Sequence, residues 1–341
     1  MLSFQNDYSE GAAPEIIEAL SATNLDSQPG YGSDQYCLQA QNKIKEVMSN
    51  PNADIFFLTG GTQTNAIVID AFLQKYQAVI SADSGHINIH EAGAIEAGGH
   101  KVIALKANNG KLEPNTLKEY LLAFYQDENH PHMAQPGMVY ISQPTELGTL
   151  YSKSELQQLH KITCEYHLPL YVDGARLGYS LRAPQNDISL QDLNELTDAF
   201  YIGGTKVGAL CGEAVVFTHH NQPDNFLTLV KQHGGLLAKG RLLGIQFLTL
   251  FTDDLYFRLS DNAIKMAMII KEELKKKGYR FFIDSPTNQQ FIIIDNKQYQ
   301  DLKEKIRLSY WEKFDNEHTV VRICTSWATT VKNVEELLRI L

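Results

Sequence analysis

Two stretches of the sequence, LYVDGARLG (Leu170–Gly178) and AFYIGGTKVGA (Ala199–Ala209), carry the strongest indication of the fold. Each opens with a short run of apolar, β-prone residues and then reaches a turn that contains glycine. Asp173 stands at the first turn and Lys206 at the second. Such runs are typical of buried strands in a parallel sheet, and ligands bind outside the carboxyl ends of these strands. The two stretches therefore predict strand ends that present a carboxylate and an amine to one crevice.

Outward from these turns, short β-rich runs alternate with longer segments of helical periodicity. The predicted strands are Ile55–Thr59, Ala78–Ser81, Lys101–Leu105, Met138–Ser142, Leu170–Val172, Ala199–Ile202 and Ala214–Thr218. The predicted helices are Thr64–Lys75, His90–Ala97, Pro114–Tyr125 and Ser152–His167. Ser152 and Glu155 have the spacing of a capping box. This alternation predicts an α/β fold in which helices cover both faces of a mostly parallel sheet.

The pattern changes after Asp224. Further elements are expected as a helix pair within Asn225–Leu250, a helix at Leu255–Lys277, a helix at Tyr299–Leu308, and strands at Phe281–Ile283, Gln290–Ile294 and Val320–Cys324. Residues 26–250 are therefore expected to form a large α/β domain. Residues 1–25 are too few to fold alone. We expect them to pack with residues 251–341 in a smaller α+β domain.

Composition excludes several classes of protein. The 341 residues carry 30 Lys plus Arg against 40 Asp plus Glu, a formal net charge of -10, which argues against a nucleic-acid partner. No apolar run approaches the roughly 20 residues that a membrane-spanning helix needs. The opening residues have neither a basic start nor an apolar segment, so we expect a cytoplasmic protein. The cysteines lack metal-ligand spacing and are expected to be free thiols: Cys37, Cys164, Cys211 and Cys324.

Asp173 and Lys206 together suit a site for pyridoxal 5'-phosphate (PLP). A lysine amine condenses with the PLP aldehyde as a Schiff base, and a carboxylate keeps the pyridine nitrogen protonated so that the ring accepts carbanion electrons. Taken singly, the aspartate also fits a helix cap and the lysine a solvated loop. The pair, each member placed after an apolar strand and beside glycine, favours the cofactor.

Two further segments fit this interpretation. The turn Gly60–Asn65 lies between a predicted strand and helix, where backbone amides can hold a phosphate, although such turns also occur for steric reasons alone. It lacks the motifs of dinucleotide and Walker sites. His86 follows the next strand and could stack on a pyridoxal ring, or be an ordinary polar residue. His90 lies one helical turn later, but no third ligand stands nearby in sequence, so no metal is predicted.

These residues also match a known family. The chain resembles the threonine aldolase and β-eliminating lyase family of fold type I PLP enzymes, over nearly its whole length and in the family's order. The matching segments are FQNDYSEGAAPEI around Asn6, YGSD at Tyr31–Asp34, GGTQTN at Gly60–Asn65, His86 with HEAG at His90–Gly93, DGARLG at Asp173–Gly178, GGTKVGA at Gly203–Ala209 and VRICTSWAT around Arg322.

The resemblance implies a role for each matching residue. Lys206 would form the Schiff base, Asp173 would pair with the pyridinium nitrogen, and His86 would stack on the ring. The further residues implied at the cofactor are Gly61, Thr62, Gln63, Arg176, Thr205 and Lys239. The residues implied at the amino-acid substrate are Asn6, Tyr31, Arg176 and Arg322. In a homodimer or homotetramer of the family's kind, Tyr31 and Lys239 would reach the neighbouring subunit's site.

The chain departs from the family pattern at two places. Asn6 stands where the family usually has serine, and the loop Gln143–Gly148 lacks the family's histidine. In that family the histidine lies near the substrate hydroxyl, so its absence bears on threonine as the substrate and leaves the cofactor unaffected. Glu146 is a candidate replacement as acid or base. The expected activity is retro-aldol cleavage of a threonine-like β-hydroxy-α-amino acid to glycine and an aldehyde. Another PLP-dependent lyase, a transaminase, a racemase or an inert relative that acts as a binding module remain alternatives.

Overall fold

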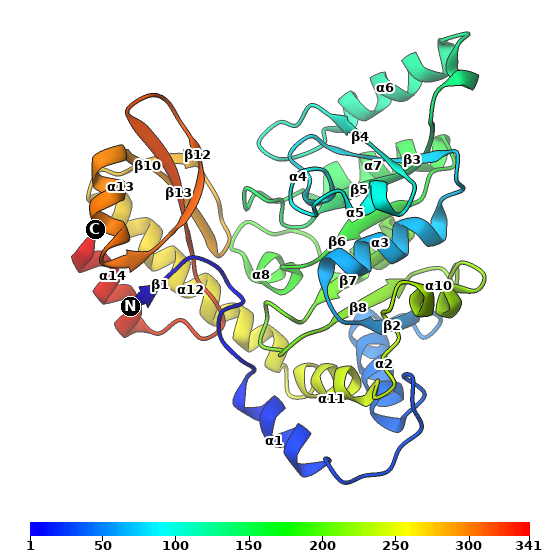
Figure 1. Cartoon of the computed structure of the whole chain (residues 1–341), viewed down its shortest axis with the longest axis horizontal. Helices are drawn as coiled ribbons and strands as arrows, with labels where there is room; N and C mark the ends of the chain where they lie inside the picture. The colour runs from blue at the N-terminus through cyan, green and yellow to red at the C-terminus, as the bar shows by residue number, and fades with distance from the viewer.

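The computed structural model describes residues 1–341 and centres on a sheet of seven strands in the order β2-β8-β7-β6-β5-β3-β4 (Figure 1). The strands are β2 (Asp54–Leu58), β3 (Gln77–Ala82), β4 (Lys101–Leu105), β5 (Gln135–Ser142), β6 (Leu170–Asp173), β7 (Ala199–Gly203) and β8 (Glu213–Phe217). β8 is the single strand that runs opposite to the other six. The predicted α/β fold with a mostly parallel sheet is confirmed, and each predicted strand of this region is present.

Helices cover both faces of the large sheet because alternate strand residues point to opposite sides. On one face, Val79 and Tyr171 share an apolar core with α3 (Gly61–Phe72), α5 (Ala94–Ala97) and α10 (Phe226–Gln232). On the other face, Ile80 and Val172 belong to a larger core. The helices of this second face are α2 (Gln35–Met48), α6 (Pro114–Gln126), α7 (Lys153–Glu165), α8 (Leu177–Arg182), α9 (Leu190–Leu196) and α11 (Arg241–Leu250). The capping box predicted at Ser152 is present at the start of α7.

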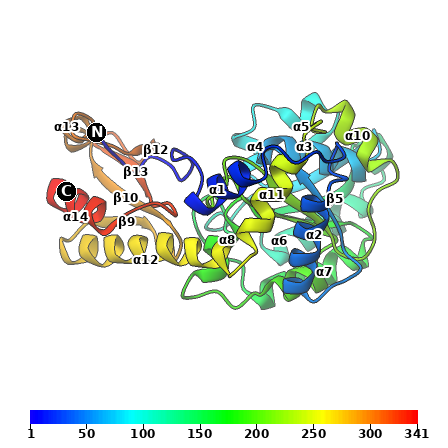
Figure 2. The same cartoon turned by 90° about the horizontal axis from the view of Figure 1, so that it is seen from below.

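A second, smaller sheet has the order β12-β13-β10-β9. Its strands are β9 (Arg280–Ile283), β10 (Gln289–Asp295), β12 (Ser309–Lys313) and β13 (His318–Cys324). Its helices are α12 (Leu255–Lys276), α13 (Asn296–Lys303) and α14 (Val331–Ile340). Helix α12 links the two sheets, because Tyr256 lies in the core of the large sheet whereas Ile270 lies in that of the small one (Figure 2).

The N-terminal segment does not pack only with the smaller sheet, which corrects the expectation for residues 1–25. Strand β1 (Leu2–Ser3) pairs with β11 (Ile306–Arg307) there. Helix α1 (Pro14–Ala22) instead packs against α11, and its buried Ile16 belongs to the core of the large sheet. The segment therefore bridges the two parts of the molecule.

Two further expectations are corrected. The helix expected at Tyr299–Leu308 ends at Lys303, and the chain then forms β11 and β12. The helix expected at His90–Ala97 is instead two short helices, α4 (His86–Ile89) and α5, separated by Gly93 at φ 73°. His86 is the first residue of α4. No helix in the structure is long and apolar enough to cross a membrane.

Candidate active site

A cavity of about 180 Å³ lies at the carboxyl ends of the parallel strands. Its lining residues are Thr59, Gly60, Gly61, Thr62, His86, Ser142, Pro144, Glu146, Asp173, Ala175, Arg176, Tyr201, Thr205, Lys206 and Glu213. These include seven residues predicted at the cofactor, namely Gly61, Thr62, His86, Asp173, Arg176, Thr205 and Lys206. The cavity is therefore the place where the sequence predictions converge.

Asp173 is a buried carboxylate held by four hydrogen bonds. The hydroxyl of Tyr201 on β7 and the backbone N–H of Ala175 donate to Oδ1, at 2.6 and 2.9 Å. The hydroxyl of Tyr140 on β5 and the amide of Asn65 donate to Oδ2, at 2.7 and 2.9 Å. Burial opposes ionisation, but the nearby His86 and these donors outweigh it and hold the pKa of Asp173 below its ordinary value. The group is therefore a fixed negative charge.

The turn after Asp173 requires glycine. A Cβ added at Gly174 would lie 1.9 Å from the carbonyl oxygen of Tyr201, so any larger residue would push β6 and β7 apart. This close approach keeps Asp173 and Tyr201 in register.

His86 is connected to Asp173 through a chain of polar side chains. Its Nδ1 lies 2.7 Å from Glu91 Oε1, which also accepts from the Asn65 amide at 2.7 Å. Because Asn65 donates to Asp173 as well, one amide joins the two carboxylates. The ligand atoms of His86, Glu91 and Asp173 lie within 4.8 Å of one another, but these hydrogen bonds already engage them. Glu91 thus fixes Nδ1 as the donor and turns the imidazole Nε2 away from that carboxylate.

Lys206 follows β7 and contributes its amine to the same cavity. Removal from bulk water, together with the nearby Arg176 guanidinium, lowers the pKa of Lys206, against the attraction of Asp7, Asp173 and Glu213. A lowered pKa increases the fraction of neutral amine, which is the nucleophilic form.

Arg176 is paired rather than free. Its Nε and Nη2 donate to the two oxygens of the buried Asp7, at 2.7 and 2.9 Å. Burial opposes ionisation of Asp7, but Arg176 and then Lys206 outweigh it and lower the pKa of Asp7 to about 2. Asn288 also donates to Asp7, at 2.9 Å, so this carboxylate joins the N-terminal segment to both sheets.

A second cavity of about 270 Å³ opens from the first toward the small sheet. It is lined by Tyr8, His86, His90, Glu146, Arg176, Lys206, Ser309, Tyr310, Trp311 and Arg322. Arg322 donates to Gln289 Oε1 at 2.9 Å and to the Gln5 carbonyl at 3.1 Å, and its guanidinium lies 5.5 Å from the Trp311 ring centroid. The second cavity therefore carries one arginine from each part of the molecule.

Glu146 lies in both cavities and is buried. One of its oxygens accepts from the His86 backbone N–H at 2.9 Å and from the Ser142 hydroxyl at 2.7 Å. Burial raises the pKa of Glu146, with the hydrogen bond from Ser142 acting in the opposite direction. This places an ionisable carboxyl beside His86 and Lys206.

Four residues that the sequence places at the site lie outside both cavities. Gln63 is engaged by Thr59 at 2.5 Å and by the His233 carbonyl at 3.3 Å. Asn6 accepts hydrogen bonds from Tyr8 and Ser9 in its own turn. The other two are Tyr31 and Lys239, which are exposed on the surface. In the single chain, therefore, these four do not face the Lys206 amine.

Three buried carboxyl groups near the site carry no role in the sequence analysis: Asp7, Glu91 and Glu213. Asp7 and Glu91 lie inside the segments that resemble the family, beside Asn6 and His90, so the sequence could have indicated them as site residues. Glu213 lies beyond the GGTKVGA segment and reaches the cavity only through the pairing of β7 with β8.

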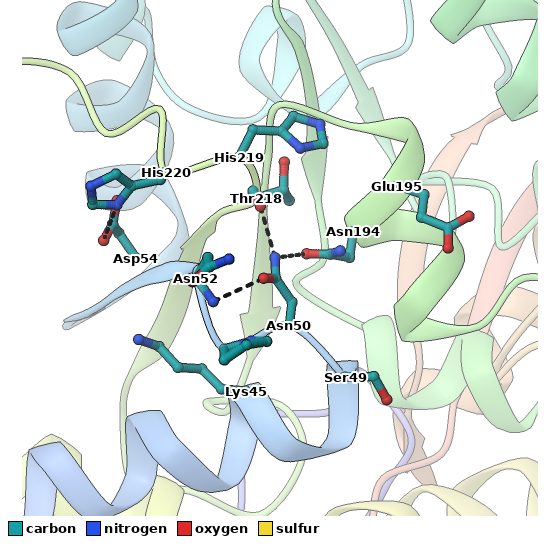
Figure 3. Close-up of a pocket in the computed structure, with 11 residues that line it drawn as sticks. Lys45, Ser49, Asn50, Asn52, Asp54, Asn194, Glu195, Thr218, His219 and His220 are labelled. Carbon is teal, nitrogen blue, oxygen red and sulfur yellow. Dashed lines mark hydrogen bonds and ion pairs between the residues drawn. The ribbon is translucent and has the colours of Figure 1, made fainter.

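A larger hollow of about 870 Å³ lies at the opposite edge of the large sheet. It is formed where β2 begins and β8 ends, and no hydrophobic residue lines it. Its side chains bond one another: Asn50 donates to Asn194 at 2.6 Å and to the Thr218 carbonyl at 2.8 Å, and His220 lies 3.0 Å from Asp54 (Figure 3). The ion pair in this hollow, His220 with Asp54, therefore lies at an open surface rather than in a buried cavity.

Comparison with known proteins identifies the family. The family model for β-eliminating lyases matches residues 4–297. The chain belongs to the β-eliminating lyase family. It is an enzyme of the lyase class, and its mostly parallel sheet is the architecture of fold type I PLP enzymes.

Individual relatives of this β-eliminating lyase agree. It is 28% identical over 339 residues to a low specificity L-threonine aldolase of Pseudomonas aeruginosa, covering 98% of this chain and 96% of that one. A low specificity L-threonine aldolase of a Pseudomonas species is 29% identical over 305 residues, covering 89% and 87%. Among solved structures, Leishmania major threonine aldolase matches with a TM-score of 0.96 and 40% identity over 100% of this chain and 98% of that one.

Proposed function

We propose that this protein is a PLP-dependent aldehyde-lyase that cleaves a threonine-like β-hydroxy-α-amino acid to glycine and an aldehyde. The observation that carries the proposal is the convergence of Asp173 and Lys206 in one cavity, each with its pKa shifted toward the form that PLP chemistry uses. The names of the relatives support threonine or a close analogue as the substrate class.

The residues present fit PLP. The first amides of α3 have no partner within the helix and suit a phosphate, and Gly60 and Gly61 line the cavity there. An added Cβ at Gly61 would lie 3.1 Å from the Tyr201 hydroxyl, so glycine keeps this cradle open. Asp173 would hold the ring nitrogen, His86 would cover the ring, and Lys206 would hold the aldehyde carbon. When bound, PLP supplies an electron sink that stabilises negative charge on the substrate Cα.

The second cavity suits the amino-acid substrate. Arg322 and Arg176 lie on its walls, and a guanidinium can meet the two oxygens of a carboxylate with parallel hydrogen bonds. Glu146 lines this cavity together with these arginines and Lys206. We assign Glu146 the removal of the substrate hydroxyl proton, because it is the carboxyl group that both cavities share.

The oligomeric state and the cellular location of the protein are also part of the proposal. We propose a homodimer or homotetramer in which Tyr31 and Lys239 serve the neighbouring subunit, since both are exposed and outside their own chain's cavities. Light scattering tests the assembly. Mixed oligomers of Lys206→Ala and Tyr31→Phe chains should regain part of the activity that each lacks alone. We also propose a cytoplasmic location, because the four cysteines are free thiols and the cytoplasm keeps thiols reduced.

The activity is tested with purified protein loaded with PLP. Threonine, allo-threonine and larger β-hydroxy-α-amino acids are supplied, and aldehyde and glycine are quantified separately. Equal amounts of aldehyde and glycine are expected, and Lys206→Ala protein is the matched control. Release of ammonia and a keto acid instead would show a β-eliminating lyase of another specificity. Amino transfer to an added keto acid would indicate a transaminase.

A further inference from the structure

The loop at residues 143–148 carries Glu146 and contacts both parts of the molecule. It leaves the large sheet where β5 ends. The Gly148 N–H donates to the Thr145 carbonyl at 2.8 Å, and the Thr145 N–H donates to the Thr149 carbonyl at 2.9 Å. These bonds close a tight turn around Glu146. A shift of the residues beside Glu146 therefore shifts its carboxyl as well.

Leu147, the next residue, packs against one face of the small sheet. The buried residues that it contacts there are Phe291, Ile293 and Val320 on β10 and β13. The other partly buried side chains on this cluster all come from the small sheet and the turn after β12, namely Phe282, Ile283, Trp311 and Phe314. Leu147 is thus the one apolar side chain that the large-sheet part of the chain contributes, and its packing there removes apolar surface from water.

Gly148 is hydrogen-bonded to the loop between β9 and β10. Its carbonyl accepts from the Ser285 hydroxyl at 3.1 Å and from the Thr287 hydroxyl at 3.2 Å. Both of these residues are fully buried. An added Cβ at Gly148 would lie 2.3 Å from Ser285 Oγ, so this close approach requires glycine. Two consecutive residues, Leu147 and Gly148, are therefore fastened to the small sheet.

The Glu146 side chain bonds in the opposite direction, toward the large sheet. Its Oε1 accepts from the His86 backbone N–H at 2.9 Å and from the Ser142 hydroxyl at 2.7 Å. Because His86 is the first residue of α4, its N–H has no acceptor within that helix. Exchange of the His86 amide proton with solvent therefore reports whether the Glu146 carboxyl is in place.

We propose that Leu147 is a positioning residue, whose packing on the small sheet holds the Glu146 carboxyl at the place that the two cavities share. The Ser285 and Thr287 hydroxyls fasten the same loop through Gly148. The small sheet thereby acts on the site through the loop as well as through Arg322. This rests on the proposed function, in which Glu146 removes the substrate hydroxyl proton.

Hydrogen exchange of the cofactor-free protein tests the placement of Glu146 without reference to activity. In the Leu147→Ala variant, the His86 amide should exchange at least about tenfold faster than in the parent protein, because its acceptor is no longer held. Leu147→Met should restore the parent rate, since methionine fills a similar volume. Residue-resolved mass spectrometry of peptides that contain His86 gives the rates.

Ile283→Ala is the matched control. It removes a similar amount of aliphatic side chain from the same cluster, but Ile283 lies outside the loop that carries Glu146. Both variants should lose thermal stability, whereas only Leu147→Ala should speed exchange at His86.

Two results would overturn the proposal: the parent rate at His86 in Leu147→Ala, or an equal rise in both variants, which would make Leu147 a packing residue only. If Leu147→Ala does not fold, the double variant Ser285→Ala with Thr287→Val takes its place. It removes both hydroxyls that bond Gly148 and leaves Leu147 intact, and the same exchange rate decides the matter.

Kinetics of the PLP-loaded enzyme separate this role from the proposed function. In Leu147→Ala, kcat should fall at least about tenfold, while KM and PLP affinity change less than about twofold. A protein that releases no aldehyde would refute the lyase assignment, yet the exchange rates would still decide on Leu147. An active enzyme with faster exchange at His86 but the parent kcat would refute Glu146 as the base and support the positioning by Leu147.

Discussion

We call the side of the large sheet at the carboxyl ends of its parallel strands the carboxyl edge, and the opposite side the amino edge. Both are polar, but their charged side chains differ in how deeply they are buried. At the carboxyl edge, Asp173 and Glu213 are 4% and 3% exposed and line a cavity of about 180 Å³. At the amino edge, the hollow is larger, about 870 Å³, and the side chain of His220 is 79% exposed while its partner Asp54 is 21% exposed. The two edges therefore differ in the burial of their charged side chains, and the larger hollow is the more exposed one.

The difference has a physical meaning. A charged group buried without full compensation lowers stability, so a protein retains several such groups in one cavity where chemistry uses them. An exposed ion pair has little effect in either direction because water solvates both partners. The carboxyl edge should therefore respond strongly to single substitutions, and the amino edge hardly at all.

The largest effect is expected from Lys206→Ala. Turnover and covalent retention of PLP should be lost, because no other amine lines the cavity. Thermal stability should not fall, since the variant removes an amine whose pKa burial already lowers. Borohydride reduction and peptide mapping of the parent protein should place the pyridoxyl group on Lys206. A label on Lys231 or Lys239 would contradict the assignment.

Asp173→Asn should leave the fold intact and reduce kcat at least about 100-fold, equivalent to roughly 2.8 kcal/mol of barrier at about 1.4 kcal/mol per tenfold. A neutral amide cannot keep a pyridine nitrogen protonated, although Tyr140 and Tyr201 can rotate their hydroxyls to suit it. Steady-state kinetics and PLP titration separate the loss of rate from a loss of binding. Near-normal kcat would mean that another group faces the ring nitrogen.

Some secondary-structure elements could be predicted from the sequence, and others could not. Strands of the large sheet such as β7 were predictable because their β-prone runs are apolar throughout. Asp173 and Lys206 stand where β6 and β7 end. The exposed strand β12 was not predicted, since only Ser309 and Trp311 in it are partly shielded and a helix was expected to reach Leu308. Helix α2 was also missed, although Asp34 caps its first turn.

Residues placed by long-range pairing escaped prediction. Glu213 faces Lys206 only because β8 runs antiparallel to β7 in one register, and Asp7 meets Arg176 only because the N-terminal segment crosses between the two sheets. Neither contact follows from local sequence. The roles assigned to the predicted residues remain the subject of these experiments.

Asp7→Asn should destabilise the protein by about 3–5 kcal/mol, because it leaves the buried Arg176 without its counter-charge. The pKa of Asp7, about 2, lies below its ordinary 3.8, so the pair's contribution is complete above pH 4 and is lost as pH falls toward 2. Urea unfolding at several pH values measures both. Asp261→Asn is the control, since its pair with Arg182 is 45% and 44% exposed and should contribute at most about 1 kcal/mol. Equal losses of unfolding free energy in the two variants would contradict the expectation that the buried ion pair matters more than the exposed one.

Arg322→Lys should weaken amino-acid binding about tenfold, equivalent to roughly 1.4 kcal/mol, and change PLP binding little. A lysine ammonium is a point charge and cannot bond Gln289, the Gln5 carbonyl and a carboxylate in the way that a guanidinium can. Titration of glycine against the cofactor spectrum measures the effect, with the exposed Arg339→Lys as control. Should Arg322→Lys titrate like the parent, Arg176 becomes the candidate for the carboxylate.

The smallest effect is expected at the amino edge, from His220→Ala. His220 and Asp54 are 3.0 Å apart, a distance that in a buried site would mark a strong interaction. Because the imidazole is largely in water, its charge is screened and its loss should change stability by at most about 1 kcal/mol, with kcat/KM unchanged. Urea unfolding and kinetics on the same preparation decide the matter. A loss of turnover comparable to that of Asp173→Asn would mean that the larger, open hollow is coupled to catalysis. Burial of charged side chains would then no longer distinguish the carboxyl edge, which holds the proposed active site, from the amino edge.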